Sequence, residues 1–157
     1  MSASEIASIT NYLEINSRLG TAGMPLRTQL NCIADNGYQV VINLALNESP
    51  GTISDEGNLV TTLKMKYIHI PVVWENPTIS DLDQFFESMQ QFHESKTFVH
   101  CVLNMRVSVF VFLYRVIYLH EDQEDAYQDV LKIWKPDAIW QSLMDRAMSR
   151  RKRQHPF

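Results

Sequence analysis

The fold is decided by residues 97–108, which read Thr97-Phe98-Val99-His100-Cys101-Val102-Leu103-Asn104-Met105-Arg106-Val107-Ser108. The first residues are a short apolar run typical of a buried strand, and the apolar segment 107–119 predicts a central helix. Cys101 therefore falls on the turn between a strand and the start of a helix. Unpaired backbone N–H groups and the positive end of the helix dipole meet at such a turn. We expect the turn to bind an oxyanion and to favour an ionised thiolate at Cys101.

Strands and helices alternate along the rest of the chain. The strand candidates are residues 18–22, 39–44, 66–70 and 97–100. The helix candidates begin at Pro25, at Ser54-Asp55-Glu56 and at Thr78 or Ser80, and continue with residues 107–119, 123–133 and 137–153. This alternation predicts an α/β fold with a mainly parallel central sheet and helices on both of its faces. Ligands of such sheets bind beyond the carboxyl ends of the strands, where we expect the loops 45–51, 72–77 and 101–106 to meet.

Length and composition indicate one ordinary globular domain over residues 1–157, with 45% hydrophobic and 20% charged residues. A net charge of −4 predicts no nucleic-acid or membrane partner, and the basic run 150–153 is interpreted as a solvated helix end rather than a site for an anionic partner. The two cysteines form no disulfide framework, and Cys32 is predicted to be a small core residue. Without a bilayer-length apolar run or a secretory leader, the expected location is cytoplasmic, where thiols stay reduced.

His100, Cys101 and Ser108 resemble, in register, the signature of the cysteine-based protein tyrosine and dual-specificity phosphatases. That signature is His-Cys, five residues, then Arg and Ser or Thr. Arg106 stands one residue early, and the arginine position of the family holds Val107. Asn104 stands where the family often has glycine, a replacement that left-handed backbone geometry tolerates comparatively well.

The resemblance extends over about residues 10–120. The segments 21–25, 37–44 and 65–72 look like a small bacterial branch of that superfamily, which includes the phosphatase domain of beta-lactamase-hydrolase-like proteins. It implies a dual-specificity-phosphatase-like fold and phosphomonoester chemistry. It also implies a phosphate-binding loop made of His100, Cys101, Val102, Leu103, Asn104, Met105, Arg106 and Val107.

The family's residue roles carry over to this loop. Cys101 would be the nucleophile, His100 would orient the loop, and Ser108 would donate a hydrogen bond to the Cys101 sulfur. Arg106 either curls back to the bound anion or points to solvent or to a carboxylate such as Glu48, Asp55 or Glu75, since one helix position rotates a side chain by ~100°.

The general acid has no exact counterpart. The family carries an aspartate beyond a Tyr-x-x-Ile-Pro-like stretch, which residues 67–71 match, but no aspartate follows here. Glu75 is the nearest carboxylate to that position, and Asp81 is the next one along the chain.

The leading hypothesis is a phosphatase that hydrolyses phosphomonoesters through a phosphocysteine intermediate. Its alternative is a weak or inactive phosphate-binding module (a pseudophosphatase), favoured by the displaced Arg106 and the missing aspartate. A sulfurtransferase or arsenate-type reductase is a further alternative, although Cys32 is badly placed to resolve a disulfide. We expect no cofactor and no metal, because His93, His120 and His155 lack ligand spacing. The expected partner is a phosphorylated small molecule or phosphoprotein, and the oligomeric state is left open.

Overall fold

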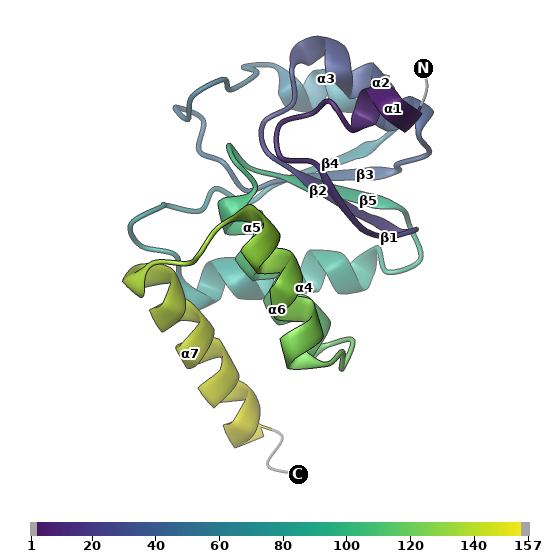
Figure 1. Cartoon of the computed structure of the whole chain (residues 1–157). Coiled ribbons are helices and arrows are strands. Elements are labelled where there is room, and N and C mark those ends of the chain that lie inside the picture. The colour runs from purple at the N-terminus through teal and green to yellow at the C-terminus, as the bar shows by residue number, and fades with distance from the viewer. Residues whose placement is uncertain (1–2, 155–157) are drawn as a thin grey trace.

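The structure is a computed structural model that describes residues 3–154, so that His155 lies outside the described residues. Within them one five-stranded sheet has the strand order β1-β2-β5-β3-β4 (Figure 1). The strands are β1 (Leu13–Asn16), β2 (Leu19–Ala22), β3 (Val40–Asn43), β4 (Lys66–His69) and β5 (Thr97–His100). Every neighbouring pair is parallel except β1 with β2, which forms an antiparallel hairpin at the edge. The predicted mainly parallel sheet is confirmed.

Helices cover both faces of this sheet (Figure 1). One face carries α1 (Ala3–Ile6), the 3-10 turn η1 (Arg27–Gln29), α2 (Leu30–Asp35) and α3 (Glu56–Thr62). The other carries α4 (Ile79–Gln91), α5 (Met105–Ile117), α6 (Gln123–Ile133) and α7 (Ala138–Gln154). Two separate buried apolar clusters result, because each face of the sheet packs against its own helices. The predicted arrangement of helices on both faces is therefore confirmed.

The central elements are buried on all sides, as their continuous apolar sequences predict. All four residues of β5 are buried, and so is every residue of α5 from Arg106 to Val116. Cys32 is buried in α2, as predicted for a core residue. At the start of α4, Thr78 rather than Ser80 is the cap, because its hydroxyl accepts from the Asp81 N–H while the Asp81 carboxylate accepts from the Thr78 N–H.

Three elements differ from the prediction. The strand β1 was missed, because only two of its four residues are apolar and the edge position leaves it half exposed. The helix predicted from Pro25 is a 3-10 turn followed by α2, which begins only at Leu30. The central helix α5 begins at Met105, two residues before the apolar segment. None of the helices described in residues 3–154 is long and apolar enough to cross a membrane.

Candidate active site

The loop that follows β5 holds Cys101 at the carboxyl edge of the sheet, directly before α5 (Figure 1). Its carbonyl groups are tied to the surrounding protein. The Val102 carbonyl accepts from the Met24 N–H at 2.9 Å, and the Leu103 carbonyl accepts from the Asn11 side-chain amide at 3.0 Å. The Cys101 carbonyl lies 3.2 Å from His100 Nδ1. Three successive carbonyls are therefore held by groups outside the loop.

The N–H groups of the same loop are left unpaired. None of the six backbone N–H groups of residues 102–107 has a hydrogen-bond acceptor within residues 3–154. The Cys101 N–H pairs with the Ala22 carbonyl, and the ordinary helical pattern resumes with the Ser108 N–H on the Asn104 carbonyl. Successive free amides at a helix start form a concave anion-binding nest. The free amides that the sequence predicts between Cys101 and Ser108 are therefore present. Binding of an anion to this cradle stays a prediction.

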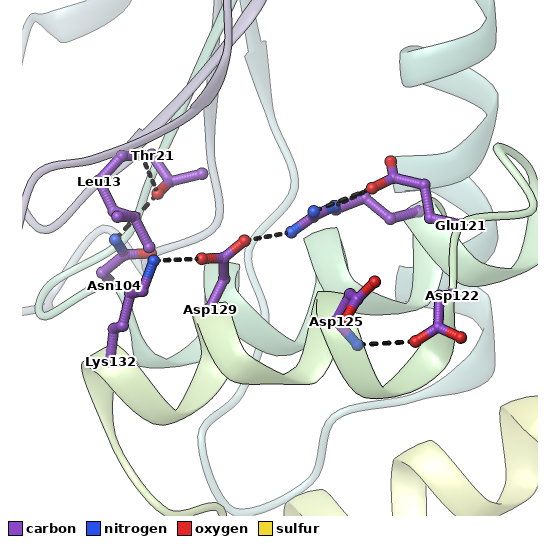
Figure 2. A network of polar contacts seen from close by, with 9 residues as sticks. Leu13, Thr21, Asn104, Glu121, Asp122, Asp125, Asp129 and Lys132 are labelled. Carbon is purple, nitrogen blue, oxygen red and sulfur yellow. Dashed lines mark hydrogen bonds and ion pairs between the residues drawn. The ribbon is translucent and has the colours of Figure 1, made fainter.

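The cradle depends on a left-handed residue and on one glycine. Asn104 has φ of 67°, and its side-chain amide donates to the Asn11 carbonyl at 2.8 Å. The same amide donates to the Thr21 hydroxyl at 3.1 Å (Figure 2). Gly23 lies so close to the loop that a Cβ there would meet the Val102 carbonyl oxygen at 2.3 Å. These contacts hold the loop against the β1–β2 hairpin and the residues that flank it.

A pocket of about 230 Å³ opens at the cradle. The three loops predicted to meet each contribute to its lining, with Pro50, Trp74 and Cys101. The remaining lining residues are Val102, Leu103, Met105 and Arg106. Cys101 and Arg106 are thus the only lining residues with reactive or charged side chains, and the rest of the wall is apolar. Cys101 itself is a free cysteine and 1% exposed, so that its thiol is reached through the pocket.

Arg106 lines this pocket beside Cys101. It is 6% exposed, its Nη1 donates to the Val72 carbonyl at 2.9 Å, and its guanidinium carbon lies 6.0 Å from the Trp74 ring centroid. Neither alternative direction, toward solvent or toward a carboxylate, is found. No carboxylate of residues 3–154 pairs with Arg106, and Asp55 instead pairs with Arg27 at 2.7 Å. Arg106 therefore lines the same pocket as Cys101 and has a carbonyl group as its hydrogen-bond partner.

Val107 occupies the family's arginine position and is fully buried in the core. Val107 and Arg106 face different surroundings, because side chains one position apart on a helix point in directions ~100° different. With Val107 directed into the core, its predicted part in the loop is limited to its free backbone N–H.

Ser108 does not make the predicted hydrogen bond to the Cys101 sulfur. Its hydroxyl donates to the Met105 carbonyl at 2.6 Å and accepts from Trp134 Nε1 at 2.9 Å. A hydroxyl has one proton to donate, so the sulfur receives none from it in this arrangement. Ser108 instead joins the first turn of α5 to the end of α6.

Glu75 is exposed and is not among the residues that line the pocket. It lies in the turn between Val73 and Asn76, next to Trp74, whose carbonyl accepts from Trp140 Nε1 at 3.2 Å. Asp81 is engaged in the cap of α4. The Asp81 carboxylate is thus used in a helix cap, whereas the Glu75 carboxylate makes no hydrogen bond or ion pair within residues 3–154.

Sequence reasoning missed Glu56 as a residue of the site. Its carboxylate is 3% exposed and lies 2.6 Å from Nε2 of the fully buried His100, while the amide of Asn43 donates to its other oxygen at 3.4 Å. The same amide donates to the Tyr67 hydroxyl. Burial raises the pKa of Tyr67 to about 12; this hydrogen bond opposes the rise, and the charge of Glu56 adds to it. The only sequence signal was an acidic residue at a helix start, which predicts a solvated position.

The solved structures show what this architecture resembles. Two crystal structures of a candidate phosphatase (DUF442) from Shewanella putrefaciens CN-32 match with TM-scores of 0.85 and 0.81, at 29% and 30% identity. Each match covers 95% of this chain, and 98% and 96% of the respective solved chain. Searches of protein-family models and of curated proteins find no match.

More distant structures share the fold alone. PTPMT1 in complex with PI(5)P matches with a TM-score of 0.79 at 12% identity, over 92% of this chain and 98% of that one. Tk-PTP in its active form matches with a TM-score of 0.75 at 14% identity, over 89% and 97%. The fold and the place of Cys101 within it define a member of the cysteine-based, protein-tyrosine-phosphatase-like superfamily. Within that superfamily, the chain belongs to the DUF442 family.

Proposed function

We propose that this protein is a cysteine-dependent phosphatase that hydrolyses phosphomonoesters. The observation that carries the proposal is the ring of unpaired N–H groups at residues 102–107 around a free cysteine. Such amides stabilise the charge that develops on the equatorial oxygens of a transferring phosphoryl group. The similarity to the DUF442 structure, itself described as a candidate phosphatase, supports the same chemistry.

In the proposed reaction the Cys101 thiolate attacks phosphorus, and the bond from phosphorus to the alcohol oxygen breaks. An acid gives its proton to the departing alcohol, for which Glu75 is the candidate because it follows Trp74 of the pocket wall. Water then attacks the phosphocysteine, the sulfur–phosphorus bond breaks, and the thiolate and inorganic phosphate are released with one proton. Each step conserves atoms and charge without a metal or cofactor taking part.

Arg106 is proposed to serve the bound phosphoryl group in place of the family's arginine. Its Nη1 is held by the Val72 carbonyl, and its side chain lines the pocket with Cys101. A guanidinium has five N–H donors, so the group can keep its bond to Val72 and still donate to phosphate oxygens. A buried arginine without a carboxylate is also suited by charge to an incoming anion.

A second candidate function is a phosphate-binding module with little or no turnover. It is favoured by the position of Glu75, which is exposed and outside the pocket lining, and by Val107 at the family's arginine position. Such a module would bind a phosphorylated small molecule or a phosphoprotein through the same cradle. In either function a free thiol in the cradle is suited to a reducing compartment, which the cytoplasm provides.

Hydrolysis of 4-nitrophenyl phosphate by the wild-type protein and by Cys101→Ser, with calorimetric titration of inorganic phosphate into both, separates these functions. A phosphatase is expected to lose all turnover on this substitution while it keeps its phosphate binding. Phosphate binding without Cys101-dependent turnover on aryl, nucleotide or sugar phosphates would establish the binding module instead. If neither protein binds phosphate, the anion cradle itself is refuted.

A further inference from the structure

The buried pair of Glu56 and His100 is a polar contact that the proposed reaction does not use. The two side chains are 3% and 0% exposed and come from α3 and β5, with Oε2 and Nε2 2.6 Å apart. On its other side, the His100 ring places Nδ1 3.2 Å from the carbonyl oxygen of Cys101. A chain of contacts thus runs from the interior of the molecule to the first peptide of the phosphate loop.

Hydrogen-bond chemistry fixes the position of one proton in this chain. A carbonyl oxygen can only accept, so Nδ1 must carry a proton to bond with the Cys101 carbonyl. Nε2 then either shares its own proton with a Glu56 carboxylate or accepts one from a protonated Glu56. Nδ1 keeps its proton in both cases, and the pair as a whole is neutral. A neutral imidazole without this partner would be free to take the other tautomer, with the proton on Nε2.

We propose that Glu56 is a positioning residue, which holds His100 in the form that donates from Nδ1 to the Cys101 carbonyl and thereby keeps the phosphate loop in its anion-binding conformation. The carbonyl would otherwise be free to turn toward the thiolate, where its negative end would oppose both thiolate and phosphate. This inference rests on the proposed function of the loop as an anion cradle.

The surroundings of Glu56 hold its carboxylate in place. The side-chain NH₂ of Asn43 donates to Glu56 Oε1 and to the Tyr67 hydroxyl, while the side-chain oxygen Oδ1 of Asn43 accepts from the Ala45 N–H. The Glu56 carboxylate is therefore fixed from the side opposite His100. One carboxylate oxygen bonds to Asn43 and the other to the His100 ring, so that a carboxamide of the same shape can make both hydrogen bonds. The oxygen of a glutamine would accept from Asn43, and its NH₂ would donate to Nε2.

The test compares Glu56→Gln with Glu56→Leu, and uses Asp55→Asn as the matched control. Asp55 is the acidic neighbour at the same helix start, and its partner is Arg27 rather than His100. Calorimetric titration with inorganic phosphate and the rate of Cys101 alkylation by iodoacetamide are measured for each variant. Glu56→Leu is expected to weaken phosphate binding and to slow alkylation by roughly five- to tenfold, the value of one buried hydrogen bond. Glu56→Gln and Asp55→Asn should stay within about twofold of wild type.

Alkylation of Cys32 serves as the internal control for folding, because that thiol is buried in α2 away from the loop. Faster Cys32 alkylation in Glu56→Leu would reveal unfolding, and the decision would then rest on nitrogen NMR of the His100 ring in Glu56→Gln. The expected spectrum shows a proton on Nδ1. A proton on Nε2 alone, together with wild-type phosphate binding, would overturn the inference.

A folded Glu56→Leu protein that binds phosphate and reacts at Cys101 as wild type does would also overturn it. The same holds if a folded Glu56→Gln protein proves as impaired as Glu56→Leu. These results differ from failure of the proposed function, in which the wild-type protein itself would bind no phosphate.

Discussion

Two buried arginines of the helix α5 differ in the groups that they pair with. Arg115, near the carboxyl end of α5, meets Glu121 at 2.9 Å and Asp129 at 2.6 Å, and Asp129 in turn meets Lys132 (Figure 2). Arg106, at the amino end, has one carbonyl as its partner and no carboxylate within residues 3–154. Arg115 is 9% exposed and Arg106 is 6% exposed, so the two arginines are buried to a similar extent. A buried cation is stable when it is paired, and of these two arginines only Arg106 lacks a carboxylate partner within residues 3–154.

Replacing Arg106 tests this comparison with the largest expected effect. Arg106→Met keeps the length of the stem and removes the charge, and kcat/KM for 4-nitrophenyl phosphate should fall by about 100- to 1,000-fold, as for a lost transition-state donor. The free energy of unfolding in urea should fall only by about 1 kcal/mol, because the Val72 carbonyl is the group that loses its hydrogen-bond donor. Turnover close to that of wild type would show that Arg106 belongs with Arg115 among the structural residues, and that Cys101 and the loop amides act without it.

Adding a methyl group at Gly23 tests the backbone side of the same site. The Cβ of Gly23→Ala would lie 2.3 Å from the Val102 carbonyl oxygen, so the loop must move away from the hairpin. We expect about tenfold weaker binding of inorganic phosphate and a loss of about 1–3 kcal/mol in the free energy of unfolding. Titration calorimetry and urea denaturation measure the two effects. Gly37→Ala is the matched control, because its φ of 86° also strains an alanine while its Cβ would meet no atom closer than Lys96 Cδ at 4.0 Å. Gly37 precedes β3, whereas the phosphate loop follows β5, which is parallel to β3. Equal phosphate binding in both variants contradicts the idea.

Replacing Arg115 is expected to lower stability and to leave turnover unchanged, which is the reverse of the expectation for Arg106. Arg115→Met leaves Glu121 without its cation and Asp129 with Lys132 alone. It should lower the free energy of unfolding by roughly 2 kcal/mol, less than for a fully buried pair because both carboxylates are partly exposed. The kcat/KM of the folded protein should stay unchanged. A loss of turnover at unchanged stability would remove the distinction between the two ends of α5.

Acid should weaken the Arg115 network slightly, with the smallest effect of the four. Burial raises the pKa of Asp129, but its bonds with Lys132 and Arg115 outweigh this and hold the pKa below the usual 3.8. A carboxyl group with a lowered pKa stabilises the folded state above 3.8 and loses that contribution as the pH falls through its folded value. The stability difference between wild type and Arg115→Met should therefore shrink by a few tenths of a kcal/mol between pH 5 and pH 3, measured by urea denaturation. A difference that grows in acid would contradict this assignment.

The sequence predicted most of the fold, because its signals were local and strong. Residues 97–100 and 107–119 are mostly apolar, which only a central strand and a central helix can bury. The edge strand β1 has no such signal, since half of Leu13–Asn16 is polar and its pairing is set by the hairpin. The local sequence pattern therefore predicted the central strands of the sheet and missed the edge strand β1.

The site was predicted in its backbone and less completely in its side chains. The free amides follow from any strand–loop–helix junction, whereas the direction of Arg106 depends on the left-handed turn at Asn104 and on the carbonyl of Val72. Ser108 was predicted to face the sulfur and instead bonds to Trp134, a residue of the α6 end that no local motif indicates. Glu56 is 44 positions from His100, so that their contact has no local signature.

The ties between the phosphate loop and the β1–β2 hairpin also bear on the order of folding. The Asn11 side chain donates to the Leu103 carbonyl over 92 positions of chain, and the Asn104 side chain donates to the Asn11 carbonyl over 93 positions. Closing so long a segment costs entropy that local helix formation does not, and contacts of this range slow folding. The cradle is therefore expected to acquire its shape late, when the hairpin docks beside β5. A peptide of residues 97–119 alone would carry the cysteine and the arginine and still lack the cradle.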